Sequence, residues 1–354
     1  MVGRVMEKIK LGVIFGGMST ENEVSIVSAS YVLSNLNKDK YDIYPIYIDK
    51  NGNWWEYQEE FKPREFGKEI NKKEKIENVF NYLKNLNVIF PVLHGLYGED
   101  GTIQGLFELL KIPYVGCHVL ASSVGMDKVY AKIIFEKAGL NQTKSKYLRK
   151  FGDKYILVDD NFNETIMEDK EVAKKIAKEI KFPMFVKPSN SGSSVGVKKA
   201  TNEDELVFAI NYASKYDKKI LVEEGIDGRE IECAVLGNED VIASGVGEIK
   251  SAEEFYTYDS KYNNVESKTD IPANISKEIS EEIRKLAIKA FKAIDGKGLS
   301  RVDFFVEKGT NKIYINEINT LPGFTSISMY PKLWEESGIK YKDLLDKLIE
   351  LAMN

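Results

Sequence analysis

The side chains best suited to chemistry lie near the carboxyl end of the chain, in two apolar runs that predict the strands of a hairpin. Because side chains alternate along a strand, Arg301 and Asp303 share one face. Glu317 and Asn319 likewise share one face of the next strand. A three-residue loop at 309–311 would place Asp303 opposite Glu317. The same register would place Arg301 opposite Asn319.

Two opposed carboxylates repel each other and destabilise a sheet. A hard cation between them would remove that repulsion. Oxygen ligands from Asp, Glu and Asn suit Mg²⁺ or Mn²⁺, with phosphate oxygens and water completing the coordination shell. The alternative is a solvated sheet face on which Arg301 forms a surface ion pair, and spacing alone leaves both interpretations open.

A glycine- and serine-rich segment, KPSNSGSSVG at 187–196, follows another predicted strand. Small residues let backbone N–H groups approach phosphates closely. Lys187, at the end of the strand, could then reach a phosphate. The segment is not a Walker loop, because the pattern GxxxxGK[ST] is absent from the chain. An ordinary flexible hairpin tip with a solvated lysine is the alternative.

Three further polar turns follow predicted strands. In the turn at 16–21, Glu21 either stabilises a helix N-terminus or faces a substrate amine; the dinucleotide pattern GxGxxG is absent. In the turn at 94–101, His94 is either a ligand group or a hydrogen-bonding partner within the turn. The Pro-Gly turn at 319–326 either presents backbone N–H groups to an oxyanion or is a plain turn.

The first third of the chain alternates predicted strands with helices, which is typical of a mostly parallel, doubly wound sheet. Ligands of such sheets bind beyond the carboxyl ends of the strands. Gly16-Gly17 and His94-Gly95 fall at such ends. The predicted strands are 11–15, 41–48 and 88–92, and the predicted helices run from about 21 to 36 and from 105 to 110.

The remainder of the chain predicts a different arrangement of hairpins and helices. In the middle we expect a helix at 126–138, a charged stretch at 151–181 that ends in a helix, and a hairpin of strands 184–187 and 195–199. Strands are also predicted at 220–223, 230–236 and 241–248, with a polar loop at 251–270. The last part predicts an amphipathic helix around 279–294, the carboxylate hairpin and a helix at 342–353. These patterns divide the chain into domains at 1–118, 119–223 and 224–354.

Composition excludes several classes of protein. The 354 residues contain two cysteines and two histidines, so a disulfide framework, a cysteine-rich zinc site and a centre of three histidines are ruled out. The formal net charge of −5 gives no reason to expect nucleic acid as a partner. No apolar run is long enough to cross a membrane. We therefore expect a cytoplasmic protein with neither membrane nor nucleic-acid partners.

Four segments together resemble the D-alanine–D-alanine ligase family of the ATP-grasp superfamily. They are GGMSTENEVS at 16–25, HGLYGEDGTIQG at 94–105, KPSNSGSSVG at 187–196, and RVDFFV at 301–306 with NEINTLPGFTS at 316–326. The resemblance covers nearly the whole chain. It implies a three-domain ATP-grasp fold and the ATP-dependent joining of two D-alanine molecules through an acyl phosphate, for peptidoglycan precursor synthesis.

The resemblance also implies a nucleotide and metal site between the central and C-terminal domains. Lys128 and Lys187 match the lysines that contact the phosphates of ATP. The positions that match the adenine and ribose contacts are Glu223, Ile226 and Glu230, while Phe305 matches the apolar wall and Asn316 stands beside the metal ligands. The ligands of two Mg²⁺ ions, or of Mn²⁺ as a substitute, would be Asp303, Glu317 and Asn319.

Further matches concern the amino-acid substrates and catalysis. Glu21 matches the residue that holds the ammonium group of the first D-alanine. A mobile loop at 256–268 would close over the site, with Lys261 facing the phosphates and Tyr262 forming a hydroxyl contact. The other matches are Ser193 as the second hydroxyl partner, His94 as a substrate contact, Arg301 and the Gly323 N–H as oxyanion stabilisers, and Ser328 and Met329 at the carboxylate of the second substrate.

Some alternatives stay open within this resemblance. Glu224 stands where many relatives carry lysine. Ligases that use D-serine as acceptor share most of these motifs, although an apolar residue at Met329 favours D-alanine. D-lactate-specific ligases usually lack the Lys261-Tyr262 pair present here. A regulatory nucleotide-binding protein on the same scaffold is a third alternative, and the resemblance further implies a homodimer.

Overall fold

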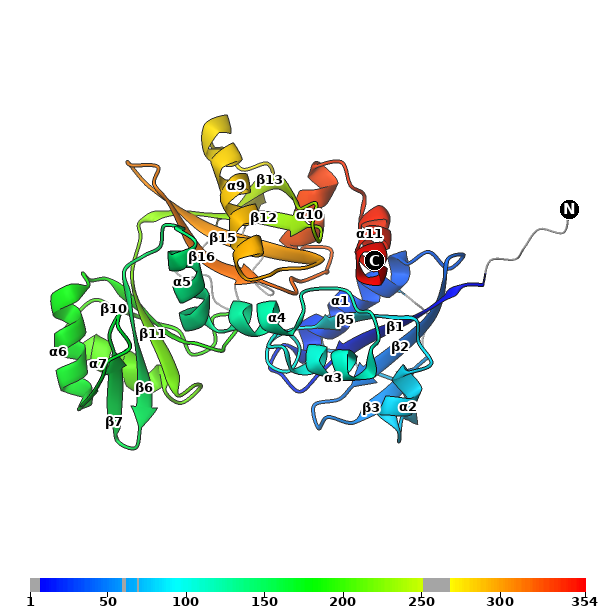
Figure 1. Ribbon diagram of the computed structural model, residues 1–354, viewed down its shortest axis with the longest axis horizontal. Helices are drawn as coiled ribbons and strands as arrows, with labels where there is room; N and C mark the ends of the chain where they lie inside the picture. The colour runs from blue at the N-terminus through cyan, green and yellow to red at the C-terminus, as the bar shows by residue number, and fades with distance from the viewer. Residues whose placement is uncertain (1–6, 59–61, 69, 251–267) are drawn as a thin grey trace, which may run out of the picture.

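The computed structural model describes residues 7–58, 62–68, 70–250 and 268–354. Three sheets lie side by side in these residues, one from each third of the chain (Figure 1). The domain boundaries near 118 and 223 stay predictions. Among the described residues, no helix combines the length and the apolar character that a bilayer span requires.

The N-terminal sheet has the strand order β4-β3-β2-β1-β5. Strands β1, β2 and β5 are parallel, as predicted, while β3 and β4 add an antiparallel edge that was not predicted. Helices α1 and α11 cover one face and α2 and α3 the other. The elements are β1 (Ile9–Gly16), α1 (Asn22–Asn35), β2 (Tyr41–Ile48), β3 (Trp54–Tyr57), β4 (Lys72–Lys75), α2 (Val79–Leu83), β5 (Val88–Leu93) and α3 (Thr102–Leu110).

The helix predicted at 126–138 is confirmed as α5, and the short helix α4 before it was not predicted. Helix α4 (Val119–Met126) ends and α5 (Lys128–Lys137) begins at Asp127. Asp127 has extended backbone angles, and its carboxylate accepts hydrogen bonds from the N–H groups of Val129 and Tyr130. An aspartate at this position caps the new helix, which therefore begins two residues after the predicted start.

The central sheet is antiparallel, with the strand order β10-β9-β11-β6-β7-β8. The charged stretch at 151–181 was predicted without strands, and it contains β7 and β8; β6, just before it, was also not predicted. Helices α6 and α7 cover one face. The elements are β6 (Ser145–Phe151), β7 (Lys154–Val158), β8 (Glu164–Met167), α6 (Asp169–Glu179), β9 (Met184–Pro188), β10 (Lys198–Ala200), α7 (Glu203–Ala213) and β11 (Lys219–Glu224).

The C-terminal sheet is also antiparallel, with the strand order β14-β13-β12-β15-β16. Helix α9 covers one face, and α10 and α11 cover part of the other. Most of the predicted loop at 251–270 lies outside the described residues, and its last three residues form β14. The elements are β12 (Gly228–Leu236), β13 (Ile242–Lys250), β14 (Lys268–Asp270), α9 (Lys277–Ala293), β15 (Leu299–Glu307), β16 (Ile313–Asn319), α10 (Met329–Glu336) and α11 (Tyr341–Met353).

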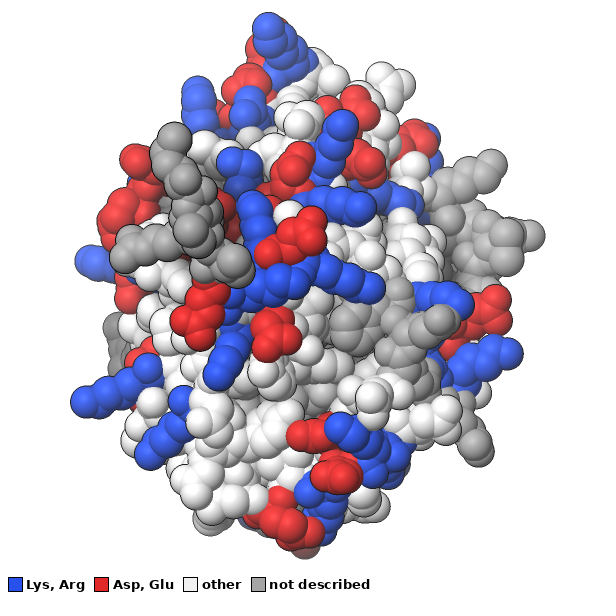
Figure 2. All heavy atoms as spheres, turned by 90° about the vertical axis from the view of Figure 1, so that its right-hand side faces the viewer, with Lys and Arg blue, Asp and Glu red and all other residues white. Residues whose placement is uncertain are grey.

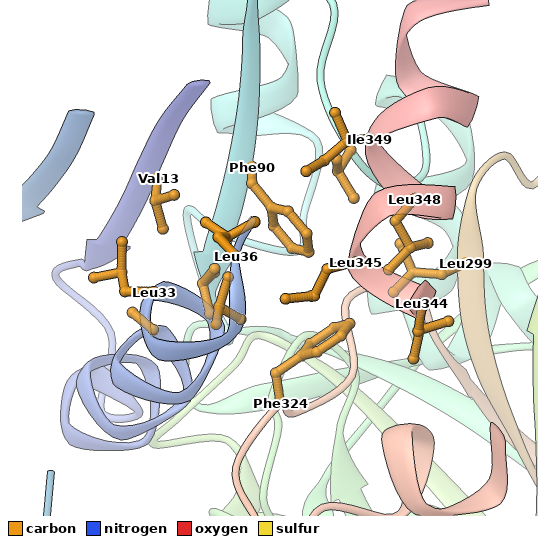
Figure 3. Packing of buried hydrophobic residues seen from close by; sticks show 14 of the residues in the cluster. Val13, Leu33, Leu36, Phe90, Leu299, Phe324, Leu344, Leu345, Leu348 and Ile349 are labelled. Carbon is orange, nitrogen blue, oxygen red and sulfur yellow. The ribbon is translucent and has the colours of Figure 1, made fainter. Parts of the chain in front are cut away.

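One buried apolar cluster joins the first and last parts of the chain. Leu345 and Leu348 of α11 pack in the same cluster as Val13 of β1 and Phe90 of β5 (Figure 3). Phe324, from the turn after β16, stacks edge-to-face on Phe90 with ring centroids 5.7 Å apart. This cluster fixes the carboxyl edge of the N-terminal sheet against the turn that follows the carboxylate hairpin.

The charges of the chain are intermixed on the face that lies at the right of Figure 1. Lysine and arginine side chains alternate there with aspartate and glutamate (Figure 2). The large cavity described next differs from this face, because partly buried lysines lie beside buried carboxylates in its lining.

Candidate active site

A cavity of about 690 Å³ lies between the central and C-terminal sheets and reaches the carboxyl edge of the N-terminal sheet. Its lining includes Glu21 from the N-terminal part, Lys187 from the central sheet and Glu317 from the C-terminal sheet. A volume of this size suits a small-molecule ligand. The three sheets therefore jointly build one site.

Strand alternation explains how each sheet presents polar groups to this cavity. In β9, Met184 and Val186 are buried under α6 and α7, whereas Phe185 and Lys187 line the cavity. In β12, Ile231 and its alternate neighbours pack on α9, and the opposite face carries Glu230 and Glu232. Each sheet is thus apolar toward its helices and polar toward the other sheet.

The carboxylate hairpin has the predicted register at its active end. Asp303 pairs with Glu317 and Arg301 pairs with Asn319. The predicted three-residue loop was wrong, because Glu307 N–H donates to Lys312 O across a four-residue turn. A bulge compensates for the extra residue: Phe304 pairs with Ile315, which leaves Asn316 without a partner across the ladder.

This bulge changes which side chains reach the cavity. Strict alternation would turn Asn316 away from the side on which Glu317 lies. Instead both residues line the cavity. The side-chain oxygen of Asn316 lies 3.4 Å from Lys187 Nζ, on the facing sheet. The bulge therefore brings two adjacent oxygen donors to one site.

Arg301 and Asp303 form a buried pair. Arg301 donates from Nε to Asp303 Oδ1 at 2.8 Å and from its terminal nitrogen to Oδ2 at 2.7 Å. Its Nε also lies 3.0 Å from Glu232 Oε2. Burial alone would lower the pKa of Arg301, but Asp303 and Glu232 outweigh it and raise the pKa well above the ordinary value. The alternative of a surface ion pair was wrong, since Asp303 is 2% exposed.

The donor set around this pair fits a hard cation. Glu317 and Asn319 line the cavity, and Asp303 lies directly behind them, held by Arg301 and by Asn319 Nδ2 at 3.0 Å. All the candidate ligand atoms are oxygens, as Mg²⁺ requires. Within the described ranges, no three His, Cys, Asp or Glu side chains group as a metal site. A cation here would therefore need amide and phosphate oxygens besides the two carboxylates.

Glu223 holds two lysines, of which Lys187 lines the cavity. Lys187 Nζ lies 2.8 Å from Glu223 Oε2, and Lys132 Nζ lies 3.1 Å from the other oxygen, Oε1. Burial would raise the pKa of Glu223, but the two lysines outweigh it and lower the pKa to about 2. Burial would likewise lower the pKa of Lys187, yet Glu223 and Glu317 raise it. Glu223 and Lys187 are therefore both charged at neutral pH.

Lys128 opens α5 at the edge of the cavity, directly after the capping Asp127. Its ammonium donates to Ser191 O at 2.6 Å and lies 3.7 Å from Glu317 Oε2. The same helix N-terminus is tied to the glycine-rich loop, because Ser189 Oγ donates to Asp127 Oδ1 at 2.6 Å. The cap thus positions Lys128 between the loop and the carboxylate hairpin.

The glycine-rich loop runs from 189 to 197, longer than the predicted tip at 188–194. Ser193 and Ser194 both have positive φ, at 49° and 59°. Non-glycine residues held in this sparsely populated region cluster at active sites and ligand clamps. The hydroxyl of Ser193 donates a hydrogen bond to Glu21 Oε1, so the loop closes onto the N-terminal part of the chain.

Glu21 and His94 meet where the strand order of the N-terminal sheet reverses, with β1 between β2 and β5. Gly16 pairs with Leu93, which sets the two polar turns side by side. Glu21 stands at the N-cap position of α1 but makes no capping hydrogen bond with its side chain. It is buried, and it faces the cavity instead.

His94 connects this edge to the Pro-Gly turn. Its Nδ1 lies 3.2 Å from Leu321 O, and because a carbonyl only accepts, Nδ1 carries the proton in this contact. Its Nε2 then accepts from Ser28 Oγ at 3.1 Å, and Ser28 in turn accepts from Phe324 N–H at 3.3 Å. His94 thus holds the turn that contains Gly323.

The other predicted site residues divide into two groups. Ile226, Glu230 and Phe305 line the cavity, as do Gly323, Ser328, Met329 and the unmatched Glu224. Ser328 Oγ accepts from Thr325 N–H at 2.9 Å. Lys261, Tyr262 and nearly all of the predicted mobile loop at 256–268 lie outside the described residues.

Three residues of this site were not predicted. Lys132 contacts Glu223, Glu232 contacts Arg301, and Asp127 caps α5. Lys132 follows Lys128 by one helical turn, and Glu232 follows Glu230 by the strand period of two. Those two spacings were the available signals.

The sequence of this chain matches a known family along most of its length. Residues 10–117 match the family model described as D-ala D-ala ligase N-terminus, and residues 154–350 match D-ala D-ala ligase C-terminus. The three-sheet architecture is the ATP-grasp fold of these ligases. The chain therefore belongs to the D-alanine–D-alanine ligase family.

Individual relatives agree with this assignment. The D-alanine–D-alanine ligase of Acetivibrio thermocellus is 50% identical, over 98% of this chain and 96% of its own length. The structure of the D-alanine-D-alanine ligase from Coxiella burnetii is 35% identical with a TM-score of 0.80, covering 98% of this chain and 94% of that one. The VanG D-Ala:D-Ser ligase from Enterococcus faecalis has the same TM-score at 36% identity, covering 98% and 100%.

Proposed function

We propose that this enzyme joins two D-alanine molecules to D-alanyl-D-alanine, with ATP as co-substrate and an acyl phosphate as intermediate, for peptidoglycan precursor synthesis. The observation that carries the proposal is the convergence of Glu21, Lys187 and Glu317 from three sheets on one cavity. An amine-binding carboxylate, a phosphate-binding lysine and a cation-binding carboxylate are what activation of an amino acid by ATP requires.

The nucleotide would lie between the central and C-terminal sheets. Lys128 and Lys187 would neutralise its phosphates, while Glu223, Ile226 and Glu230 would contact its adenine and ribose. Phe305 would pack under the base. Asp303, Glu317 and Asn319 would hold two Mg²⁺ ions, or Mn²⁺ in their place, beside Asn316. When bound, the ions would supply charge neutralisation at the oxygens of the transferred phosphoryl group.

The amino acids would lie toward the N-terminal sheet. Glu21 would hold the ammonium group of the first D-alanine, and His94 would lie against its carboxylate. The amine of the second D-alanine attacks the activated carbonyl carbon, phosphate leaves, and the tetrahedral oxyanion would be stabilised by Arg301 and the Gly323 N–H. Ser328 and Met329 would receive the carboxylate of the second substrate.

The loop at 256–268 would exclude water from the acyl phosphate. In it, Lys261 would face the phosphates, and Tyr262 would contact Ser193 and Glu21. We expect Tyr262→Phe to lower turnover more than the melting temperature. Equal relative losses in both would assign Tyr262 a structural role instead.

The identity of the acceptor amino acid is tested by competition. Because Met329 is buried and apolar, packed near Gly247 and Leu333, we expect D-alanine to be preferred over D-serine as acceptor. The measurement offers both amino acids at equal concentration with ATP and Mg²⁺, and separates the dipeptides by mass spectrometry. An excess of D-alanyl-D-serine would establish the alternative acceptor, and the absence of any dipeptide would overturn the proposal.

We also propose that the enzyme acts in the cytoplasm as a homodimer, as the family resemblance implies. Sedimentation equilibrium over a range of protein concentrations tests the dimer. A single species with the mass of one chain at all concentrations would contradict it.

A further inference from the structure

A row of alternating charges runs from the interior to the cavity. Thr143 Oγ1 lies 3.2 Å from Lys132 Nζ, which lies 3.1 Å from Glu223 Oε1. The other carboxylate oxygen, Oε2, lies 2.8 Å from Lys187 Nζ. The side chains of Lys132 and Glu223 are 10% and 6% exposed. Thr143 is also buried, so solvent screens this row only weakly.

The charge of this row depends on Lys132. Glu223 and Lys187 alone would form a neutral pair, because one carboxylate offsets one ammonium group. With Lys132 on the second oxygen, the three groups carry a net charge of +1. Lys187 lines the cavity, so its positive charge, which Glu223 then offsets less, faces an anion bound there.

We propose that Lys132 is a positioning residue for the nucleotide: it neutralises Glu223, so that Lys187 keeps its positive charge for the phosphates. The inference rests on the proposed ATP site and adds to it a residue that would not contact the nucleotide. Lys132 does not line the cavity and lies one helical turn beyond Lys128. It acts through Glu223 rather than by contact with the ligand.

The neighbouring charges do not supply the same compensation. Lys128 lies near Glu317, at 3.7 Å, and its bond to Ser191 O holds it toward the loop. Glu230 and Glu317 add negative charge near Lys187, and both raise its pKa. Removing Lys132 would therefore leave Lys187 among carboxylates and weaken its attraction for phosphate.

The test compares a nucleotide with the nucleoside that shares its base and ribose but carries no phosphate charge. Lys132→Gln keeps a hydrogen-bond donor and removes the charge, and Lys132→Arg keeps the charge. Calorimetric titration with ADP and with adenosine, in the presence of Mg²⁺, measures the two affinities. For Lys132→Gln we expect the ADP affinity to fall by at least about tenfold, while the adenosine affinity changes by less than about twofold. Lys132→Arg should keep both close to wild type.

A double variant separates charge from packing. In Lys132→Gln with Glu223→Gln, the charge of Lys187 is again unopposed by Glu223. The ratio of ADP to adenosine affinity should therefore return toward the wild-type ratio, even though both affinities fall. The double variant has no unpaired buried charge at the two substituted positions, so we expect it to fold. The inference can therefore be tested even if Lys132→Gln alone does not fold.

The outcomes distinguish this inference from the proposed function. Equal losses of ADP and adenosine affinity in Lys132→Gln would assign Lys132 a structural role and overturn the inference. Unchanged ADP and adenosine affinities in Lys132→Gln would also overturn the inference. So would a double variant whose ratio of ADP to adenosine affinity stays as low as that of Lys132→Gln. In both cases the wild type would still bind ADP. A wild-type chain that binds no ADP would overturn the proposed function itself.

Discussion

Ser193, in the glycine-rich loop after β9, donates a hydrogen bond to Glu21, which precedes it by 172 residues at the start of α1. This contact joins the proposed phosphate loop to the proposed amine-binding carboxylate. It explains why Ser193 adopts a positive φ, since the strained conformation directs its hydroxyl toward the N-terminal sheet. The contact thereby ties two distant segments together on one side of the cavity.

Removing this hydroxyl should impair catalysis more than folding. A hydrogen bond to a charged group contributes roughly 1.5–3 kcal/mol, so Ser193→Ala should lower kcat/KM for D-alanine by roughly ten- to hundredfold. The melting temperature should change little, because the loop is partly exposed. Ser191→Ala is the matched control, since Ser191 bonds within the loop to Val195 O. A large effect of Ser191→Ala and none of Ser193→Ala would contradict this role.

Gly192, which lies beside Glu21, allows a steric test of the proposed substrate contact at Glu21. A Cβ on Gly192 would lie 2.7 Å from Glu21 Oε2, so Gly192→Ala should displace the carboxylate and raise KM for D-alanine by about tenfold. A Cβ on Gly105 in α3 would meet no atom within 4 Å, and alanine favours a helix. Gly105→Ala should therefore leave KM unchanged. Equal KM values for the two variants would contradict a substrate contact at Glu21.

If the carboxylate hairpin holds Mg²⁺, the reaction rate of its variants should depend differently on the Mg²⁺ concentration. Asp303→Asn removes one charge opposite Glu317, so the Mg²⁺ concentration that gives half-maximal rate should rise by about tenfold. Asp160, an exposed residue far along the chain from the hairpin, provides the control as Asp160→Asn. An unchanged Mg²⁺ titration for Asp303→Asn would exclude this carboxylate from the cation site.

The lowered pKa of Glu223 should make the stability of the fold depend on pH. Its pKa is lowered from 4.5 to about 2 in the folded chain, so it stabilises the fold above about pH 4.5 and loses that contribution as the pH falls toward 2. A pKa difference of this size corresponds to about 3 kcal/mol at neutral pH, as an order of magnitude. Glu223→Gln should therefore be less stable than wild type at pH 7, and the difference should shrink below pH 4.5.

Urea denaturation of both chains at pH 7, 4.5 and 3 measures this difference. Glu282→Gln provides the control, because that carboxylate is exposed on α9. A gap between wild type and Glu223→Gln that is constant over this range would contradict the paired state of Glu223.

Local patterns predicted the parts of the site that lie on regular strands. Alternation placed Asp303 and Glu317 opposite each other, and the strand ends placed Glu21 near His94. The loop length was wrong, yet the register at the site was right, because the bulge at Asn316 offsets the extra turn residue. Alternation along one strand contains no information about such a compensation, which depends on the partner strand.

Two of the missed strands lack an apolar face. Strand β4 is KKEK and fully exposed, and it is held by backbone pairing with β3 rather than by burial. Strand β8, at one edge of the central sheet, is also largely exposed. Edge strands commonly carry charged side chains, which weaken the apolar signal on which strand prediction depends. Lys132 was missed because its partner Glu223 is distant in sequence.

ATP should activate the carboxylate of the first D-alanine as an acyl phosphate in this cavity. An isotope experiment tests this step: D-alanine labelled with ¹⁸O in its carboxylate is supplied with ATP and Mg²⁺, and the released phosphate is analysed by mass spectrometry. We expect one labelled oxygen in each phosphate formed with each dipeptide, because the carboxylate oxygen leaves with the phosphoryl group. Dipeptide formed with unlabelled phosphate, or no dipeptide at all, would contradict it.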